Sequence, residues 1–456
     1  MSLHRLLAVA AACALPAAAE VTFTKDVAPI LYQHCASCHR PNDIAPMALL
    51  TFKQARPWAT AIREAVLTKR MPPWHADPSI GTFANDARLK DDEIRILKEW
   101  AEGGAKEGAP EDLPAAPTFS DEWRLGKPDL IFQIPEERVI KVGERDYNVT
   151  ITVPTNLKED IWVQGVEIRP GNRKVVHHAH VFVEMPDAPK NKAASEPAPE
   201  NPFPELDRKK VFYNDGQTHV KMDAPVLDDG CSNLFGGDFP NTSHAGESGI
   251  LASYLPGREP DNWPAGFGRR VPAGAILKFQ IHYSATTGKE ETDRTSVGLI
   301  LSKEPPKQIV QRLDVHNHFF KIPAGAANHE VTACYAFDRD VDLLTYTPHM
   351  HYRGKDMKIE AEKPDGTTET LLWVPKYEFE WQTTYKLTKP MTLPKGTRLK
   401  ITAHFDNSAN NPKNPDPTRV IRWGEPSQEE MMDGWFEYLV PKEAPQTSAN
   451  LDPDSR

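Results

Sequence analysis

The sequence predicts a multidomain fold in which a small all-α domain precedes two all-β sandwich domains. Before about residue 112, apolar residues recur at helical spacing, as in Ile94, Leu97 and Trp100. After about residue 128, short alternating runs are separated by Pro, Gly, Asn and Asp, which is typical of all-β domains. The length of 456 residues fits about three domains of ordinary size.

The N-terminus has the pattern of an export signal. Arg5 precedes a short apolar run at 6–15, and Ala17 and Ala19 supply a small-residue cleavage pattern. The run is too short to span a bilayer as a helix, and no other apolar run approaches that length. We therefore expect an exported protein, periplasmic or secreted, with no membrane span; a lipoprotein signal at Cys13 is the alternative.

Helix and loop signals set the expected boundaries. Thr24 is placed to cap a first helix, and Asp91 begins another that the Gly-Gly pair at 103–104 ends. A Pro- and Ala-rich stretch at 110–117 opens a linker. We expect a signal peptide at 1–19, the helical domain at 20–112, a linker at 113–127, β-domains at 128–304 and 305–442, and a polar tail at 443–456.

The composition narrows the function. The chain is mildly acidic, with a formal net charge of -10, so no basic surface for nucleic acid is expected. Hydrophobic residues make up 39% of the chain, enough to build cores, and the 42 prolines belong to loops and strand edges.

Four of the five cysteines remain after signal removal, and two of them lie in one motif. Cys35-Ala36-Ser37-Cys38-His39 is the C-x-x-C-H pattern that attaches haem c through two thioethers and an axial imidazole. Cys231 and Cys334 then form either a disulfide in an oxidising compartment or two buried thiols.

The sixth haem ligand is predicted to be Met71, which lies 32 residues after His39. His75 and Met47 are the alternatives, as is an open distal position. The segment resembles a small class I c-type cytochrome in motif and size, which implies electron transfer when methionine fills the sixth site.

Histidines in the β-region form a second set of candidate ligands. The apolar residues of strand 277–283 occupy one face, so His282 points to the other. His349 and His351 are two apart, the spacing that lets two imidazoles on a strand reach one ion. Pro348 removes a ladder donor just before them and indicates a strand edge or a bulge.

Strand alternation gives a weaker prediction for the two adjacent methionines at 431–432 than for His282. Met432 shares parity with the apolar Phe436, and Met431 with Asp433, which favours Met431 as an available thioether. Trp435 lies on the Met431 face and weakens that argument, and ordinary packing of both methionines is the alternative.

His177 and His178 are adjacent, so an ideal strand sends them to opposite faces. Both can bind one ion only if the strand kinks there. His180 lies two residues beyond His178, and it either replaces a ligand or orients one.

The chain resembles the copper type II, ascorbate-dependent monooxygenases in the order of four motifs. These are H-H at 177–178, F-Q-I-H-Y at 279–283, H-x-H-x-x-G-K at 349–355 and E-M at 430–431. This family includes peptidylglycine α-hydroxylating monooxygenase and dopamine β-monooxygenase. The resemblance covers about residues 128 to 440 and implies two jelly-roll domains that face each other across a cleft, each with one copper ion. His177, His178 and His282 then hold the electron-transfer copper, and His349, His351 and Met431 the oxygen-activating copper, where the soft sulfur ligand favours Cu(I).

The implied function is hydroxylation of a C–H bond with dioxygen in a small-molecule or peptide substrate, with electrons from an external donor entering through the tethered haem. Two departures from the family stand out. Few cysteines are present, and Thr347 stands where the peptidylglycine enzyme has an arginine for the substrate carboxylate, which argues against peptide amidation. The alternative functions are a haem/copper electron carrier without oxygen chemistry and a ligand-binding module tethered to a redox partner.

Overall fold

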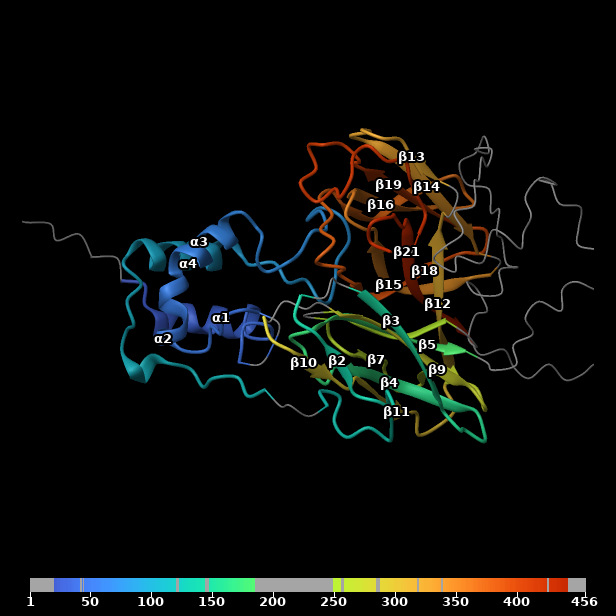
Figure 1. Cartoon of the computed structure of the whole chain (residues 1–456), viewed down its shortest axis with the longest axis horizontal. Coiled ribbons are helices and arrows are strands. Elements are labelled where there is room, and N and C mark those ends of the chain that lie inside the picture. Colours follow the sequence, from blue (N-terminus) through green and yellow to red (C-terminus); the bar gives the residue numbers. More distant parts are fainter. Residues whose placement is uncertain are drawn as a thin grey trace, which may run out of the picture. The chain divides into compact units, whose positions relative to one another are not determined.

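Helices are confined to the N-terminal part of the described chain, and strands make up most of the rest (Figure 1). The computed structural model describes residues 20–41, 43, 45–119, 123–143, 147–184, 249–255, 258–283, 288–317, 320–337, 339–424 and 426–441. The expected signal peptide with Cys13, the tail at 443–456 and Cys231 lie outside these residues. Within them, no helix has the length and apolar character needed to cross a membrane.

The chain divides into two compact units. Unit 1 comprises residues 1–41, 45–72 and 89–117, and unit 2 comprises residues 42–44, 73–88 and 118–456. The helices of unit 1 are η1 (Phe23–Val27), α1 (Ala28–His34), α2 (Phe52–Ala55), η2 (Arg56–Trp58), α3 (Ala59–Leu67), α4 (Asp91–Glu102) and η3 (Pro110–Asp112).

Unit 1 is held together by a small apolar core. As its spacing predicts, α4 buries Leu97 and Trp100 completely and ends at Gly103. Burying a side chain of that size stabilises the fold by roughly 1.5–3 kcal/mol. The predicted cap at Thr24 is wrong, because the helix already begins at Phe23 and Thr22 occupies the cap position. The backbone N–H of Thr22 donates instead to the carboxylate of Asp26, which lies in the first turn.

The segment 73–88 belongs to unit 2, although it falls inside the range expected for the helical domain. Trp74 and Phe83 lie in an apolar core with Tyr385, with ring centroids 5.0 and 5.3 Å from that tyrosine. The backbone N–H of Ala84 donates to the carbonyl of Lys386 at 2.7 Å. Sequence periodicity shows helical spacing on both sides of this segment but not which core the segment itself joins.

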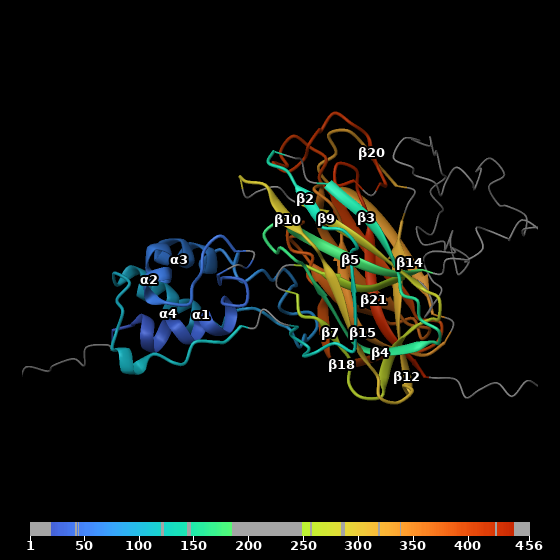
Figure 2. The same ribbon diagram turned by 60° about the horizontal axis from the view of Figure 1, so that its bottom comes forward.

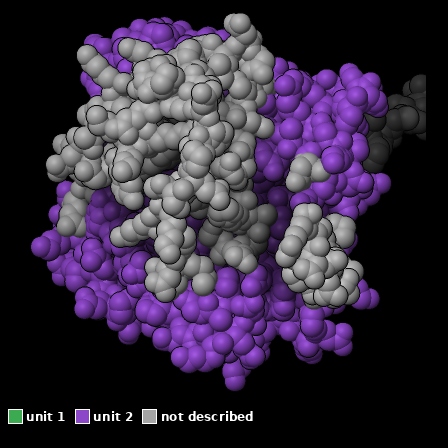
Figure 3. Space-filling model, turned by 90° about the vertical axis from the view of Figure 1, so that its right-hand side faces the viewer, with its two compact units in different colours: residues 1–41, 45–72, 89–117 green, residues 42–44, 73–88, 118–456 purple. Residues whose placement is uncertain are grey.

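Unit 2 contains two β-sandwiches that share one nine-stranded sheet, ordered β1-β11-β4-β8-β12-β21-β15-β18, with β7 paired to β4. A parallel pairing of β8 with β12 joins its two halves. Figure 3 shows one face of this unit in purple. The first half consists of β1 (Leu130–Gln133), β11 (Ser296–Leu301), β4 (Ile161–Arg169), β8 (Phe267–Val271) and β7 (Asp261–Asn262). The second half consists of β12 (Gln308–His316), β21 (Asp433–Pro441), β15 (Val341–His349) and β18 (Tyr385–Leu393).

Each half packs against its own four-stranded sheet. The first sandwich is completed by β3 (Tyr147–Pro154), β9 (Ile276–Tyr283), β5 (Val176–Glu184) and β6 (Gly249–Tyr254), of which β3, β9 and β5 run side by side in Figure 2. The second is completed by β14 (His329–Ala336), β19 (Arg398–Phe405), β16 (Gly354–Glu362) and β17 (Thr368–Val374). Two small pairs, β2 (Arg138–Ile140) with β10 (Glu291–Asp293) and β13 (Lys321–Ile322) with β20 (Ile421–Arg422), complete the described strands.

Strand alternation sorts side chains between the cores and the faces that carry the candidate ligands. On β9, Leu277, Phe279, Ile281 and Tyr283 are fully buried in the first core, as the sequence predicts. On β21, Phe436 and Tyr438 lie in the second core. The opposite faces of these same strands carry His282 and Trp435, so the candidate ligands lie outside both apolar cores.

Candidate metal centres

The adjacent histidines of β5 lie at a β-bulge. Val176 pairs with Tyr283 and His178 with His282, so two residues of β5 oppose one step of β9 and His177 is the extra residue. A bulge bends the strand and redirects a side chain that regular alternation would send to the opposite face. Two adjacent histidines on a strand can bind one ion only if the strand kinks, and that kink is present here.

Three imidazoles converge at this bulge and form the first cluster, His177, His178 and His282. Nδ1 of His178 lies 3.3 Å from Nδ1 of His177 and 3.4 Å from Nδ1 of His282. One nitrogen from each residue lies within 4.8 Å of the others. Two nitrogens that bind one ion at about 2.0 Å are separated by at most about 4 Å, so this set fits a single metal ion with little movement.

Electrostatics keep the first cluster available for a metal. Burial lowers the pKa of His178 well below its ordinary value, and the neighbouring histidines lower it further. A neutral imidazole retains the lone pair that a metal needs. Oε2 of Glu380 lies 3.3 Å from Nε2 of His177, and this hydrogen bond lowers the pKa of that carboxyl. Such an outer carboxylate orients a ligating imidazole and raises its basicity.

His180 is not one of the three converging residues. Its Nδ1 lies 2.8 Å from the hydroxyl of Ser253, and its ring centroid lies 5.4 Å from that of His178. The side chain is 5% exposed, and burial lowers its pKa to about 3. Of the two roles that the sequence left open, this geometry fits the outer, orienting one better.

The second cluster, His349 and His351, is anchored by other protein groups. Strand β15 ends at His349, and Met350 turns into the second core, so both histidines face away from it. Nδ1 of His349 lies 2.8 Å from the side-chain oxygen of Gln382, and Nδ1 of His351 lies 3.2 Å from the carbonyl of Glu429. A carbonyl oxygen only accepts, so this network assigns the proton to Nδ1 in each ring and leaves each Nε2 as a lone pair.

The two rings of this cluster lie 5.2 Å apart, at 89° to each other. Burial lowers the pKa of His349 to about 4 and that of His351 to about 3, so both are neutral at neutral pH. The strand is an edge at this point, as Pro348 indicates, because the pairing of β15 with β18 ends at Tyr346.

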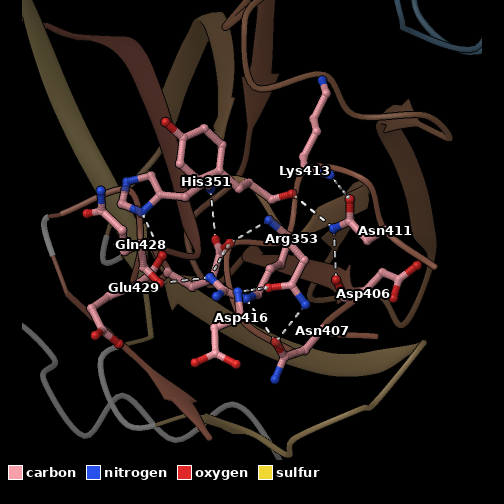
Figure 4. A network of polar contacts seen from close by, with 12 residues as sticks. His351, Arg353, Asp406, Asn407, Asn411, Lys413, Asp416, Gln428 and Glu429 are labelled. Atoms are coloured by element: carbon pink, nitrogen blue, oxygen red, sulfur yellow. Dashed lines mark hydrogen bonds and ion pairs between the residues drawn. The ribbon is translucent and has the colours of Figure 1, made fainter. Parts of the chain in front are cut away.

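A buried carboxylate holds the turn after His349. Glu430 accepts the backbone N–H groups of His351 at 2.8 Å and of Arg353 at 2.6 Å. Arg353 is fully buried and donates to Asn407 and to the carbonyl of Gln428, and Figure 4 shows this network around it. Burial raises the pKa of Glu430 to about 8, against the lowering effect of these donors.

The two methionines have different environments. Met432 is fully buried in the second core, in agreement with its predicted parity. Met431 is half-buried and outside that core, directly after Glu430 and two residues before Asp433, which pairs with His349. The backbone therefore brings Met431 into the neighbourhood of both histidines of the second cluster.

Aromatic contacts connect the two clusters. The ring of His180 lies 5.4 Å from that of His178 and 5.6 Å from that of Trp435. Trp435 in turn stacks on His349 at 4.7 Å, with the ring planes 17° apart. A continuous series of ring contacts thus runs from the first cluster to the second.

The C-x-x-C-H motif of unit 1 begins where α1 ends. Cys35 and Cys38 are half-buried, and the backbone N–H of His39 donates to the carbonyl of Cys35 at 2.8 Å. Nδ1 of His39 lies 3.2 Å from the carbonyl of Met47, which leaves Nε2 for an axial bond. Burial lowers the pKa of His39 and raises that of Cys35 to about 12. This donor set fits haem c attachment.

The three candidates for the sixth ligand lie in different places. Met71 is half-buried in unit 1, after α3, and its N–H donates to the carbonyl of Ala65. Met47 presents its carbonyl to the Nδ1 side of His39, which is opposite to the side that would face iron. His75 belongs to unit 2, where Glu378 influences its pKa. The choice of Met71 as the sixth ligand therefore stays a prediction.

Sequence reasoning assigned no role to four of the surrounding residues: Glu380, Gln382, Glu430 and Arg353. The first two lie in a loop between strands, and polar loop residues alone carry no signal of what they contact. Glu430 adjoins the candidate ligand Met431, but only the folded turn shows that it accepts hydrogen bonds from the His351 turn.

Comparisons with known proteins do not identify the chain. No family model matches it, and no curated protein does. Among solved structures, the major capsid protein P2 from bacteriophage PM2 matches 68% of this chain and 99% of its own length, at 10% identity and a TM-score of 0.22. A likeness of that strength carries no argument about function.

Proposed function

We propose that this protein is an exported copper-dependent monooxygenase whose electrons enter through a fused c-type haem domain. The observation that carries the proposal is the convergence of His177, His178 and His282 at a bulge, joined by ring contacts to a second, anchored pair of imidazoles. In this proposal the two β-sandwiches are jelly rolls, and unit 1 is a cytochrome c domain.

The two clusters suit two copper ions with different tasks. The first offers three imidazole nitrogens, and the second offers two Nε2 atoms, with the backbone of Met431 two residues from the partner of His349. Imidazole and thioether are ligands that hold redox-active copper, and sulfur favours Cu(I). Copper bound in this way supplies one-electron chemistry with dioxygen.

The protein groups around the second cluster fix its geometry. Gln382 and the Glu429 carbonyl hold each Nδ1–H, so each Nε2 has one orientation. Glu430 secures the turn that carries His351. Because none of these groups has to move to present the lone pairs, the site is preorganised for its ligand.

The path between the clusters involves His180 and Trp435. Hydroxylation with dioxygen would take two electrons and two protons, because one oxygen atom enters the substrate and the other leaves as water. A copper ion at each cluster would supply one electron, so one electron would have to pass from the first site to the second. The series His178, His180, Trp435, His349 offers consecutive ring contacts for this transfer. The haem on Cys35, Cys38 and His39 would refill the first site, with Met71 as its sixth ligand, and its covalent tether raises the effective concentration of donor.

The proposed substrate is a small molecule or a peptide. At position 347 the protein has no cationic side chain that could bind a substrate carboxylate. Thr347 is 2% exposed, and its hydroxyl donates to that of Thr384 at 2.9 Å. A buried, hydrogen-bonded hydroxyl gives no charge to a substrate carboxylate. This supports a substrate other than the C-terminal glycine of a peptide.

The decisive experiment follows electrons through protein matured in a host that attaches haem c. Metal analysis should give one haem and two copper ions per chain. After rapid mixing with a reductant, the haem should be reduced first, the Cu(II) paramagnetic signal should then disappear, and dioxygen should reoxidise both. Copper that stays oxidised beside reduced haem would overturn the proposal. Reduced protein that is inert to dioxygen would instead identify an electron carrier.

A variant pair tests the ring path. Trp435→Leu removes the central ring, and we expect inter-site electron transfer to slow at least tenfold while copper stoichiometry stays at two. Trp373→Leu is the matched control, because Trp373 lies on β17 with 38% of its surface exposed. Equal rates in the two variants would exclude Trp435 from the path.

A further inference from the structure

A third group of potential ligands, separate from both histidine clusters, lies on β12 and β21. Asp314 and His316 are two apart on β12, so they share one face, and His316 pairs directly with Asp433 of β21. The intervening Val315 and the neighbouring Leu313 point into the second core. The three polar side chains therefore lie together on the face opposite that core.

The ligand atoms of this group are close together. One atom each from Asp314, His316 and Asp433 lies within 4.8 Å of the others, and Nδ1 of His316 lies 3.5 Å from Oδ1 of Asp314. Asp433 is 1% exposed. Its Oδ1 and the Oδ1 of Asp314 are buried and accept no hydrogen bond in the described part of the chain.

The cationic groups among the described residues that interact with these carboxyls are His316 itself and Arg312, which acts on Asp314. His316 is the one described residue within ion-pair distance of Asp314, and no described lysine or arginine lies within that distance of Asp433. Burying a carboxyl oxygen without a hydrogen-bond donor is costly, and Oδ1 of Asp433 has no donor among the described residues. Two carboxylates around one imidazole therefore form a natural receptor for a doubly charged cation.

We propose that Asp314, His316 and Asp433 form a third metal site that takes a borderline divalent cation such as Zn²⁺. Two carboxylate oxygens and one imidazole nitrogen supply three ligands, and water completes the coordination. Oxygen ligands are harder than the imidazole and thioether of the other two sites, so this site discriminates against Cu(I). Asp433 also pairs with His349 on its other side, which places the cation site about one strand spacing from the second cluster.

The site is tested in full-length holoprotein with both copper sites loaded as Cu(I) under anaerobic conditions. Titration with Zn²⁺, followed by calorimetry and metal analysis, should show one further equivalent. Asp433→Asn should weaken zinc binding at least a hundredfold and leave the copper content unchanged. Asp342→Asn, a half-buried position on β15 hydrogen-bonded to Thr392, is the matched control and should bind zinc like the unaltered protein. Absence of the extra equivalent, or equal binding by Asp433→Asn, would overturn the proposal.

Thermal unfolding provides a second readout that does not depend on copper. Zinc should raise the melting temperature of the unaltered protein but not that of Asp433→Asn or Asp314→Asn, because only an intact site binds the cation. Without metal, Asp433→Asn keeps the size of the buried side chain and should melt close to the unaltered protein, which separates a loss of zinc binding from a loss of folding. Two results together would contradict the zinc site: zinc does not stabilise the unaltered protein, and the variant melts at a lower temperature without metal. They would mean that the two carboxyls share a proton instead.

Discussion

The first and second histidine clusters differ in what holds their rings. In the first, three Nδ1 atoms face one another, and Glu380 is the one acidic group paired with its imidazoles among the described residues. In the second, Gln382 and the Glu429 carbonyl each hold one Nδ1–H, so the rings are oriented by the protein. The Nδ1 atoms of the first cluster therefore converge on one position, whereas those of the second are held by protein acceptors and leave each Nε2 for an ion.

The largest expected effect is at the first cluster. His282→Ala removes one of three converging ligands, and the neighbouring His180 is held by Ser253, so we expect the protein to lose one of its two copper equivalents. Competitive Cu(I) titration against a chelator measures this loss. His404→Ala is the control, because His404 is hydrogen-bonded to Asp356 on another sheet and belongs to neither cluster. Two equivalents retained by His282→Ala would mean that the convergence at the bulge does not bind copper.

The methionine pair tests the second cluster. Met431→Ile should remove the copper–sulfur scattering from the X-ray absorption spectrum of the Cu(I) protein and abolish hydroxylation, while the haem spectrum is unchanged. Met432→Leu keeps the volume of a core residue, so it should retain the sulfur signal and cost less than about 1.5 kcal/mol of stability. A sulfur signal lost in Met432→Leu and kept in Met431→Ile would reverse the assignment.

The same comparison shows what sequence can predict. Strand alternation correctly sent His282 away from the core and Met432 into it, because a half-buried strand has a period of two. It did not predict the bulge at His177, since an inserted residue leaves no local signature and appears only when β5 pairs with β9. Alternation did predict that His177 and His178 can bind one ion only if the strand kinks.

Long-range packing explains the other features of the structure that the sequence did not predict. Segment 73–88 joins the second sandwich through Trp74 and Phe83, and aromatic residues in a Pro-rich segment do not reveal which core will bury them. Gln382 and Glu429 act on His349 and His351 from 33 and 78 positions along the chain. Their role depends on loop closure, so short-range patterns cannot detect it. The all-β class was accessible from the sequence, and the contacts that orient the ligands were not.

Acidification should weaken the metal-free protein through the buried histidines. Burial lowers the pKa of His180 and His351 to about 3 and that of His349 to about 4, and it lowers that of His178 as well. Below the ordinary histidine pKa of about 6.5, the unfolded chain takes up protons that the folded protein does not. The contribution of these histidines to stability is therefore complete at pH 7 and falls as the pH decreases from about 6.5 toward 4, while Glu430, whose pKa burial raises to about 8, contributes with the opposite sign.

Each of these histidines contributes a slope of up to about 1.4 kcal/mol per pH unit to the free energy of unfolding. Urea unfolding of unit 2, followed by tryptophan fluorescence at pH 7, 6 and 5, measures the sum. His351→Gln should reduce the slope by about one such contribution. A slope that is unchanged in His351→Gln would contradict a neutral, buried imidazole at that site.

Removal of the anchor at the second cluster should have a moderate effect. Gln382→Leu frees Nδ1 of His349 and leaves the ring without its oriented partner, so Cu(I) affinity at that site should fall about 10- to 100-fold. Competitive titration resolves this loss when the first site is already saturated. Gln280→Leu, on the half-buried face of β9, is the control for a lost amide and should leave the affinity of the second site unchanged. Undiminished affinity in Gln382→Leu would mean that the orientation of His349 depends on its stacking against Trp435.

The smallest effect should follow from Glu380→Gln at the first cluster. The side chain of Glu380 is 54% exposed, so water screens its interaction with Nε2 of His177. The amide keeps a hydrogen-bonding oxygen in place, and the other two imidazoles are untouched, so we expect less than about a tenfold loss of Cu(I) affinity. If this substitution instead costs as much as Gln382→Leu, the exposed Glu380 orients His177 as strongly as the buried Gln382 orients His349, and this contrast between the two clusters disappears.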